Sequence, residues 1–243
     1  LEVGADKIAA FVAEPVQGAG GVIIPPDGYF DHIQKICNEF EILFVADEVI
    51  TGFGRTGNWF ASQTMNLKPD VVTLAKGLTS GYMPMSAVLV GDKIAEHLIN
   101  EGGEFYHGFT YSGHPVSAAV ALANLELIET EGLIGRVRDI TAPYLANAIK
   151  QLDSHPLVGE TRSFGLLACI ELVKHKSGPV LFEPVGKVGI MCRDHAIKGG
   201  LMVRAVRDGV ILSPPLSFQT EDIDITVEKL KQALDATYVD LKK

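Results

Sequence analysis

Three short apolar segments near the start of the chain limit its fold more than any other feature. They cover residues 7–13, 42–46 and 71–75, at the intervals of roughly 30 residues that are typical of strand–helix–strand units. Residues 29–40, between the first two, have apolar side chains at helical spacing. None of the three segments alternates polar with apolar residues, as expected for strands that are buried on both faces. The sequence therefore predicts an α/β fold with a mainly parallel sheet.

An ionisable residue directly follows each of these segments, namely Glu14, Asp47 and Lys76. Ligands of open α/β sheets bind outside the carboxyl ends of the strands, so we expect the two carboxylates and the amine to converge on one crevice. A desolvated lysine forms imines with carbonyl compounds, and a carboxylate opposite a pyridine nitrogen keeps that ring protonated as an electron sink. The alternative is a structural ion pair between Lys76 and Asp47.

Three motifs carry a resemblance to a known family. Residues 13–21 (AEPVQGAGG), 47–57 (DEVITGFGRTG) and 74–77 (LAKG) resemble, in order and spacing, the signature of class-III aminotransferases, which use pyridoxal phosphate. The resemblance extends over essentially the whole chain. It implies the type I fold of aspartate aminotransferase, with a large α/β cofactor-binding domain that is incomplete at its N-terminus and a smaller α+β C-terminal domain.

The resemblance also implies a role for each residue of the motifs. Lys76 matches the lysine that holds the cofactor as a Schiff base and moves the proton between the substrate carbon and the cofactor. Asp47 matches the carboxylate that pairs with the pyridinium nitrogen. Val49 matches the residue that packs on one face of the ring, and Glu14 matches an acidic residue in the wall of the pocket.

Two further regions match parts of the family's site. Phe109 and Thr110, within residues 108–114, match a loop that reaches the cofactor phosphate of a neighbouring subunit, which implies a homodimer. Backbone N–H groups and a hydroxyl just before a helix start suit a phosphate. Arg204 matches the arginine that takes the substrate carboxylate, a role for which the planar guanidinium is well shaped. Arg207 is a rival for that role, and a plain surface arginine is the alternative.

Composition excludes several classes of partner. The net charge of −9 argues against nucleic acid and acidic membrane surfaces as partners, and no apolar run approaches membrane-spanning length.

The three cysteines, Cys37, Cys169 and Cys192, are odd in number and widely spaced, which favours reduced thiols in a cytoplasmic protein. No metal site is expected, because the two histidines that flank residues 108–113 have no third ligand. The other histidines are expected at the surface or at helix caps.

Glycines at positions 132 and 135 suggest a domain boundary, so we predict a large domain over residues 1–133 and a small one over 134–243. Residues 115–129 are apolar nearly all round and predict a buried helix. The small domain is expected to hold helices, strands and a hairpin with Asp208-Gly209 at its turn, and a last helix capped by Thr220. Its expected elements cover residues 136–152, 157–162, 165–173, 184–199, 201–205 and 209–212.

The residues and the resemblance together predict a ping-pong aminotransferase that moves an amino group from an ω-amino acid, amine or diamine to a keto acid, with pyruvate the expected acceptor. An aminomutase, an epimerase or a decarboxylase of the same fold is one alternative. A non-catalytic fragment that serves dimerisation is another. The chain begins with Leu1 and quickly reaches a buried-type strand, so we expect the C-terminal part of a longer protein, whose upstream part supplies further contacts to the cofactor.

Overall fold

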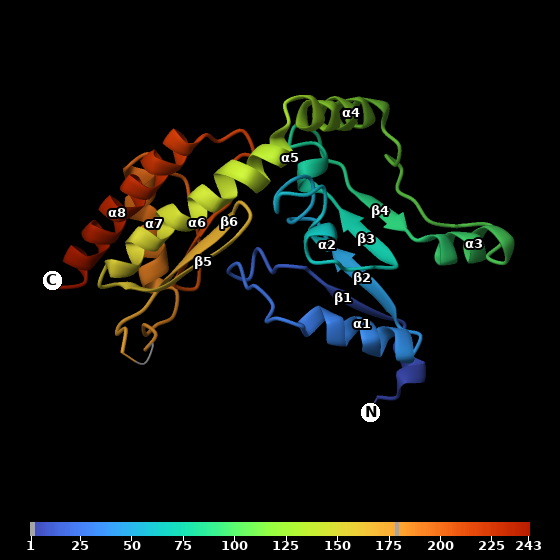
Figure 1. Ribbon diagram of the computed structural model, residues 1–243, viewed down its shortest axis with the longest axis horizontal. Coiled ribbons are helices and arrows are strands. Elements are labelled where there is room, and N and C mark those ends of the chain that lie inside the picture. The colour runs from blue at the N-terminus through green and yellow to red at the C-terminus, as the bar shows by residue number, and fades with distance from the viewer. Residues whose placement is uncertain (1–2, 178–179) are drawn as a thin grey trace. The chain divides into compact units, whose positions relative to one another are not determined.

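The computed structural model describes residues 3–177 and 180–243, which divide into two compact units (Figure 1). The N-terminal unit comprises the residues up to Pro15 together with Pro25–Ile134. The C-terminal unit comprises Val16–Ile24 and everything described from Gly135 onward. A four-stranded sheet lies in each unit.

The sheet of the N-terminal unit has the strand order β1-β2-β3-β4. Strands β1 (Ala10–Ala13), β2 (Leu43–Asp47) and β3 (Val71–Leu74) are parallel, and β4 (Ala87–Val90) runs antiparallel to β3. The prediction of a mainly parallel α/β sheet is confirmed. The antiparallel strand was not predicted, because a short apolar run such as Ala87–Val90 does not by itself distinguish a strand from part of a helix.

Within its described residues, the N-terminal unit also contains four complete helices. They are α1 (Tyr29–Glu39), α2 (Ala61–Thr64), α3 (Asp92–Asn100) and α4 (Pro115–Thr130), with short 3₁₀ turns at Ala5–Lys7 and Lys76–Leu78. Phe30 and Cys37 of α1 pack against Phe44 of β2 and against Leu67. Burial of each such side chain contributes about 1.5–3 kcal/mol, which fixes α1 on the sheet.

Helix α4 differs from its prediction. Ser117, Ala121 and Ile128 are its buried residues, whereas Leu122 and Leu127 are 69% and 54% exposed. The prediction that this helix is buried is therefore wrong for this chain. An apolar sequence gives a helix a preference for burial, but the described residues cover the helix on one side only.

The C-terminal unit has an antiparallel sheet with the strand order β5-β6-β8-β7. Its strands are β5 (Val158–Phe164), β6 (Leu167–Leu172), β7 (Arg204–Val206) and β8 (Gly209–Leu212). Its helices are α5 (Leu133–Arg136, which begins in the N-terminal unit), a π-helical segment Val137–Thr141, α6 (Ala142–Lys150), a 3₁₀ turn Gln151–Ser154, α7 (Lys187–Lys198) and α8 (Thr220–Asp240).

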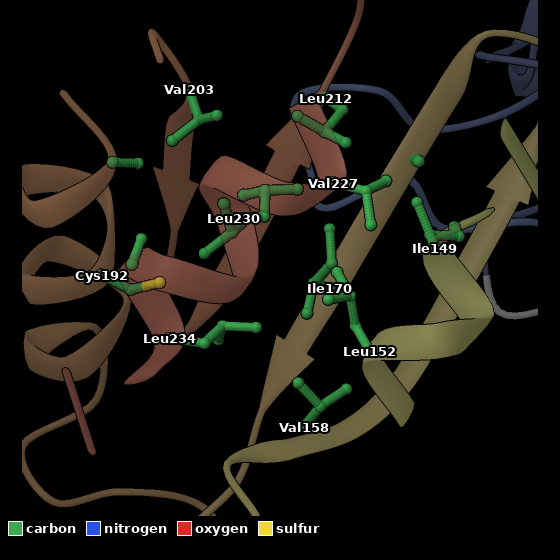
Figure 2. Close-up of a cluster of buried hydrophobic side chains, with 14 of the residues drawn as sticks. Ile149, Leu152, Val158, Ile170, Cys192, Val203, Leu212, Val227, Leu230 and Leu234 are labelled. Atoms are coloured by element: carbon green, nitrogen blue, oxygen red, sulfur yellow. The ribbon is translucent and has the colours of Figure 1, made fainter. Parts of the chain in front are cut away.

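The core of this unit lies between the helices and one face of the sheet. Alternate residues of β6, Ala168, Ile170 and Leu172, point to that face, as the two-residue period of a strand requires. Figure 2 shows Ile170 among side chains from the helices, including Ile149 of α6, Cys192 of α7, and Leu230 and Leu234 of α8. Burial raises the pKa of the Cys192 thiol to about 11, so this cysteine behaves as an apolar core residue.

Two details of the predicted small domain are wrong by one residue. The turn between β7 and β8 is Arg207-Asp208 rather than Asp208-Gly209, and Arg207 has a φ of 52°. The side chain of Asp208 is buried and contacts α7. Its carboxylate accepts hydrogen bonds from backbone N–H groups at the start of that helix. The N-cap of α8 is Gln219 rather than Thr220, and its backbone N–H donates to Asp222 Oδ2 over 2.9 Å.

Candidate active site

The carboxyl ends of β1, β2 and β3 lie side by side in the N-terminal unit. Ala13 pairs with Ala46, and Asp47 pairs with Thr73. Glu14 follows the last residue of β1, Asp47 ends β2, and Lys76 comes two residues after the end of β3. The structure therefore brings the three ionisable residues to neighbouring strand ends on one edge of the sheet.

The carboxylate of Asp47 is held from one side. Its Oδ1 accepts the backbone N–H of Val49 over 3.0 Å and the hydroxyl of Thr73 over 3.1 Å. Within the described part of the chain, Oδ2 receives no hydrogen bond and no ion pair. Asp47 is half-buried. One carboxylate oxygen is thus fixed in place, and the other is available to a ligand.

Glu48 faces away from this edge, although it is the neighbour of Asp47 in sequence. Its side chain is fully buried. Oε2 accepts the Thr51 hydroxyl over 2.7 Å and the Ala61 N–H over 2.8 Å, and Oε1 accepts the Ser62 N–H over 2.6 Å. The carboxylate therefore anchors the glycine-rich segment 51–57 and the start of α2.

Lys76 begins the 3₁₀ turn that follows β3, and its side chain is exposed. Its φ is 42°, in the left-handed region that a side chain rarely occupies. Such a conformation costs about 1–3 kcal/mol and persists only where the surroundings impose it. Gly77 contributes to that restraint, since a Cβ at this position would lie 3.0 Å from Cβ of Phe53. An exposed amine on a restrained backbone suits a group that must be held in one place.

Comparison with known proteins identifies the family. The family model described as aminotransferase class-III matches residues 1–234. The chain belongs to the class-III aminotransferases.

The chain is similar to several aminotransferases of this family. The chain is 53% identical, over 98% of its length, to the putrescine–pyruvate aminotransferase of Pseudomonas aeruginosa, of which it covers 52%. It is 42% identical, over 97% of its length, to the diaminobutyrate–2-oxoglutarate transaminase of Halomonas elongata, of which it covers 51%. The crystal structure of the ω-transaminase of Pseudomonas jessenii in complex with PMP is similar, with a TM-score of 0.93 and 41% identity over 97% of this chain and 52% of that one. The chain thus spans about half the length of the relatives that it matches.

The predicted phosphate loop of this class-III chain lies just before α4. Phe109 is 78% exposed and Thr110 is exposed. The Phe109 N–H donates to Oγ of Ser112 over 2.9 Å, and the Ser112 N–H donates back to the Phe109 carbonyl over 2.9 Å. These bonds close a compact turn that leads to the helix start at Pro115. The Thr110 hydroxyl lies on the surface of that turn.

The two arginines predicted as alternatives for the substrate carboxylate lie on one hairpin of the C-terminal unit. Arg204 is the first residue of β7, pairs with Ile211 and is exposed. Arg207 is exposed in the turn. This hairpin belongs to the C-terminal unit, whereas Lys76 and Asp47 belong to the N-terminal unit.

Among the described residues, no three His, Cys, Asp or Glu side chains gather in a way that could hold a metal ion. None of the helices in this part of the chain is long and apolar enough to cross a membrane.

Two residues next to the candidate site were not identified from the sequence. Thr73 holds Asp47, and Asn124 of α4 contacts the turn after Lys76. Both were visible as isolated polar residues, the first in an apolar strand and the second in an apolar helix. That signal could have selected them, because a polar group in such a setting needs a partner.

Proposed function

We propose that the protein is a pyridoxal-phosphate-dependent aminotransferase that moves an amino group from an ω-amino acid, an amine or a diamine to pyruvate in a ping-pong reaction. The observation that carries the proposal is the position of Lys76 and Asp47 at neighbouring strand ends. It is supported by family membership and by 53% identity to a putrescine–pyruvate aminotransferase, over about half of that relative.

The residues at this edge fit the cofactor in their chemistry. Lys76 offers an exposed primary amine to the cofactor aldehyde. Asp47 offers a carboxylate oxygen, and a carboxylate stabilises the protonated pyridine nitrogen by charge and by hydrogen bonding. When bound, pyridoxal phosphate supplies an electron-withdrawing ring that stabilises negative charge at the donor carbon.

The chain's own residues perform the remaining tasks. With the cofactor bound, Nζ of Lys76 would accept the proton from the donor carbon and later return a proton on the product side. Asp47 holds the ring in its protonated form, and the Thr73 hydroxyl and Val49 N–H hold Asp47. Val49 would pack against one face of the ring, and Glu14 would lie in the wall of the same site.

The phosphate site of this proposal is shared between two subunits. Phe109 and Thr110 of one subunit contact the phosphate bound in the other, so the active form is a homodimer. The exposure of this loop in the single chain supports the assignment. The hydroxyl of Thr110 and the N–H groups before α4 are the donors that a phosphate requires. We place the enzyme in the cytoplasm.

Arg204 binds the carboxylate of a keto acid or ω-amino acid as a planar fork. Its place at the open start of β7 leaves the side chain free to move away when an uncharged amine enters. Arg204→Ala is expected to raise KM for pyruvate while leaving the reaction with an uncharged amine less affected. If Arg207→Ala has that effect instead, the rival arginine holds the carboxylate.

The deciding experiment is an absorbance titration of the full-length protein with pyridoxal phosphate, before and after borohydride, with Lys76→Ala in parallel. The wild type is expected to show an absorbance band near the visible range when the cofactor is added, and borohydride is expected to fix the cofactor to it covalently. Lys76→Ala is expected to show neither effect. Amines and diamines are then tested with pyruvate and, separately, with 2-oxoglutarate.

Other outcomes select the alternatives. A covalent bond without any dependence on a keto acid would indicate an aminomutase, an epimerase or a decarboxylase. A full-length protein that never binds the cofactor would leave a dimerisation role.

A further inference from the structure

The turn that carries Lys76 forms three hydrogen bonds with one side chain from a distant part of the sequence. Nδ2 of Asn124, on α4, donates to the carbonyl of Gly77 over 2.8 Å and to the carbonyl of Leu78 over 3.1 Å. Its Oδ1 accepts the hydroxyl of Ser80 over 2.6 Å. Both polar atoms of the Asn124 amide therefore bond residues of this turn, namely three of the four that follow Lys76.

The same turn has few bonds of its own. The Leu78 N–H donates to the Ala75 carbonyl over 3.0 Å, and the Thr79 N–H donates to the Lys76 carbonyl over 3.3 Å. Lys76 and Ser80 both have positive φ values, 42° and 50°, which side chains rarely adopt. A strained turn of this kind relaxes unless outside contacts hold it.

Three residues from outside the turn hold it, namely Phe53, Met83 and Asn124. The carbonyl of Met83 accepts the Thr79 hydroxyl over 2.6 Å. Phe53, from the glycine-rich segment 51–57, lies against Gly77. Asn124 holds the turn through the carbonyls of Gly77 and Leu78 and the hydroxyl of Ser80. The amide is half-buried in a helix that is otherwise apolar at most positions, where a leucine or alanine would pack without needing partners. An asparagine that satisfies this turn so completely points to a need for a fixed turn geometry.

We propose that Asn124 is a positioning residue for Lys76. It holds the carbonyls of Gly77 and Leu78 and the hydroxyl of Ser80, and so fixes the backbone from which the Lys76 amine reaches the cofactor and the substrate carbon. This inference rests on the proposed function of Lys76. Asn124 itself touches neither the cofactor nor the substrate.

The test uses the full-length protein with pyridoxal phosphate. Asn124→Leu removes all three bonds and keeps the branching at Cγ, whereas Asn124→Asp keeps the acceptor for Ser80 and places an oxygen against the two carbonyls. Ser80→Ala removes one bond only. Asn147→Leu is the matched control, because Asn147 is an exposed asparagine on helix α6 of the other unit.

Three readouts separate positioning from general stability. They are the rate at which the apoprotein forms the covalent bond with added pyridoxal phosphate, the separate effects on kcat and KM, and hydrogen exchange at the amides of Leu78 and Thr79. Both Asn124 variants are expected to slow bond formation and kcat on the order of 100-fold, the effect of a misplacement of about 1 Å, with a smaller change in KM. Exchange at the two amides is expected to rise. Ser80→Ala should show a smaller effect, and Asn147→Leu should match the wild type.

Several results would overturn the inference. Wild-type bond formation and kcat in Asn124→Leu or Asn124→Asp would do so while leaving the proposed function intact. A fall in melting temperature that accounts for the lost activity, without faster exchange in the turn, would assign Asn124 a general structural role. If Asn124→Leu does not fold, Asn124→Asp and Ser80→Ala decide. A wild type that forms no covalent bond refutes the proposed function first, and this inference with it.

Discussion

The hydroxyl of Thr73 lies 3.1 Å from Oδ1 of Asp47 and links the ends of two adjacent parallel strands. The pair is in register across β2 and β3, so the contact follows directly from the sheet. Oδ1 also accepts the Val49 N–H, which leaves Oδ2 to face a ligand. The orientation of the proposed ring-binding carboxylate therefore depends on one backbone N–H and on one hydroxyl group in an apolar strand.

Thr73→Val tests that dependence. Valine keeps the β-branched shape and the strand propensity of threonine, so the sheet should be preserved. Loss of a hydrogen bond to a charged group, worth about 1.5–3 kcal/mol, is expected to weaken cofactor binding roughly tenfold or more. The dissociation constant for pyridoxal phosphate is the measurement. Thr161→Val is the control, since it removes a Thr–Asp hydrogen bond of 2.8 Å in the C-terminal unit. Equal affinities for Thr73→Val and the wild type would mean that Asp47 does not need this bond.

The sequence predicted the parts of the site that depend on local pattern. Glu14, Asp47 and Lys76 each lie at or just beyond the end of an apolar strand, and parallel strands bring their ends together. Thr73 and Asn124 act through contacts that span 26 and 44–47 residues of sequence, and no local pattern gives the partner. Their polarity within apolar elements showed that a partner was needed but not which one.

The sequence was less informative where tertiary contacts decide the structure. Helix α4 has an apolar sequence nearly all round, and composition alone could not show which side would be covered. The Arg207-Asp208 turn was displaced by one residue, because Asp208 is drawn to the start of α7 by three backbone N–H groups. The preference of the pair Asp-Gly for two-residue turns is therefore overridden by the hydrogen bonds of Asp208 to the start of α7.

Glu48→Gln is expected to destabilise the N-terminal unit. The buried carboxylate accepts one hydroxyl and two backbone N–H groups, and a glutamine must turn its own NH₂ toward at least one of these donors. One unpaired buried donor costs about 1–3 kcal/mol of unfolding free energy. Urea denaturation measures this loss. Glu39→Gln makes the same charge change at the exposed end of α1 and should leave the midpoint unchanged. A neutral effect of Glu48→Gln would show that the segment 51–62 does not rely on the carboxylate.

Arg162→Lys is expected to loosen the segment Val16–Ile24 within the C-terminal unit. The Arg162 guanidinium donates to the carbonyls of Gly21 and Val22 and to Glu171 Oε2, at distances from 2.6 to 3.1 Å. A lysine ammonium cannot reproduce this fork, so at least one bond to a charged donor, worth roughly 1.5–3 kcal/mol, is lost. Faster proteolysis within residues 16–24 is the readout. Arg193→Lys, in a partly exposed pair with Asp194, is the control. Unchanged proteolysis of Arg162→Lys would assign the segment's order to its own Gln17–Ile23 bridge.

His155 was expected at the surface or at a helix cap; it caps the C-terminus of the 3₁₀ turn Gln151–Ser154, and its side chain is only 9% exposed. Burial lowers its pKa below the usual 6.5 and outweighs the opposing effect of Asp235, whose Oδ1 lies 3.4 Å from Nε2, while Lys176 lowers the pKa further. Nδ1 accepts the Leu157 N–H over 3.2 Å, which it can do only when unprotonated. The ring of Tyr238 packs against it at 5.9 Å. The structure therefore favours the neutral imidazole.

This depressed pKa predicts how stability changes with pH. Between the folded pKa and 6.5 the unfolded chain binds more protons than the folded one, so the free energy of unfolding falls as the pH is lowered through 6.5 and stops falling, for this group, below the folded pKa. Above 6.5 the histidine makes no pH-dependent contribution. In urea denaturation, His155→Gln is expected to reduce the difference between the free energies of unfolding of the C-terminal unit at pH 7.5 and at pH 5.5. His32→Gln, at an exposed histidine, should leave that difference as in the wild type. A His155→Gln variant with the full wild-type pH dependence would mean that carboxylates, and not this imidazole, account for the loss of stability in acid.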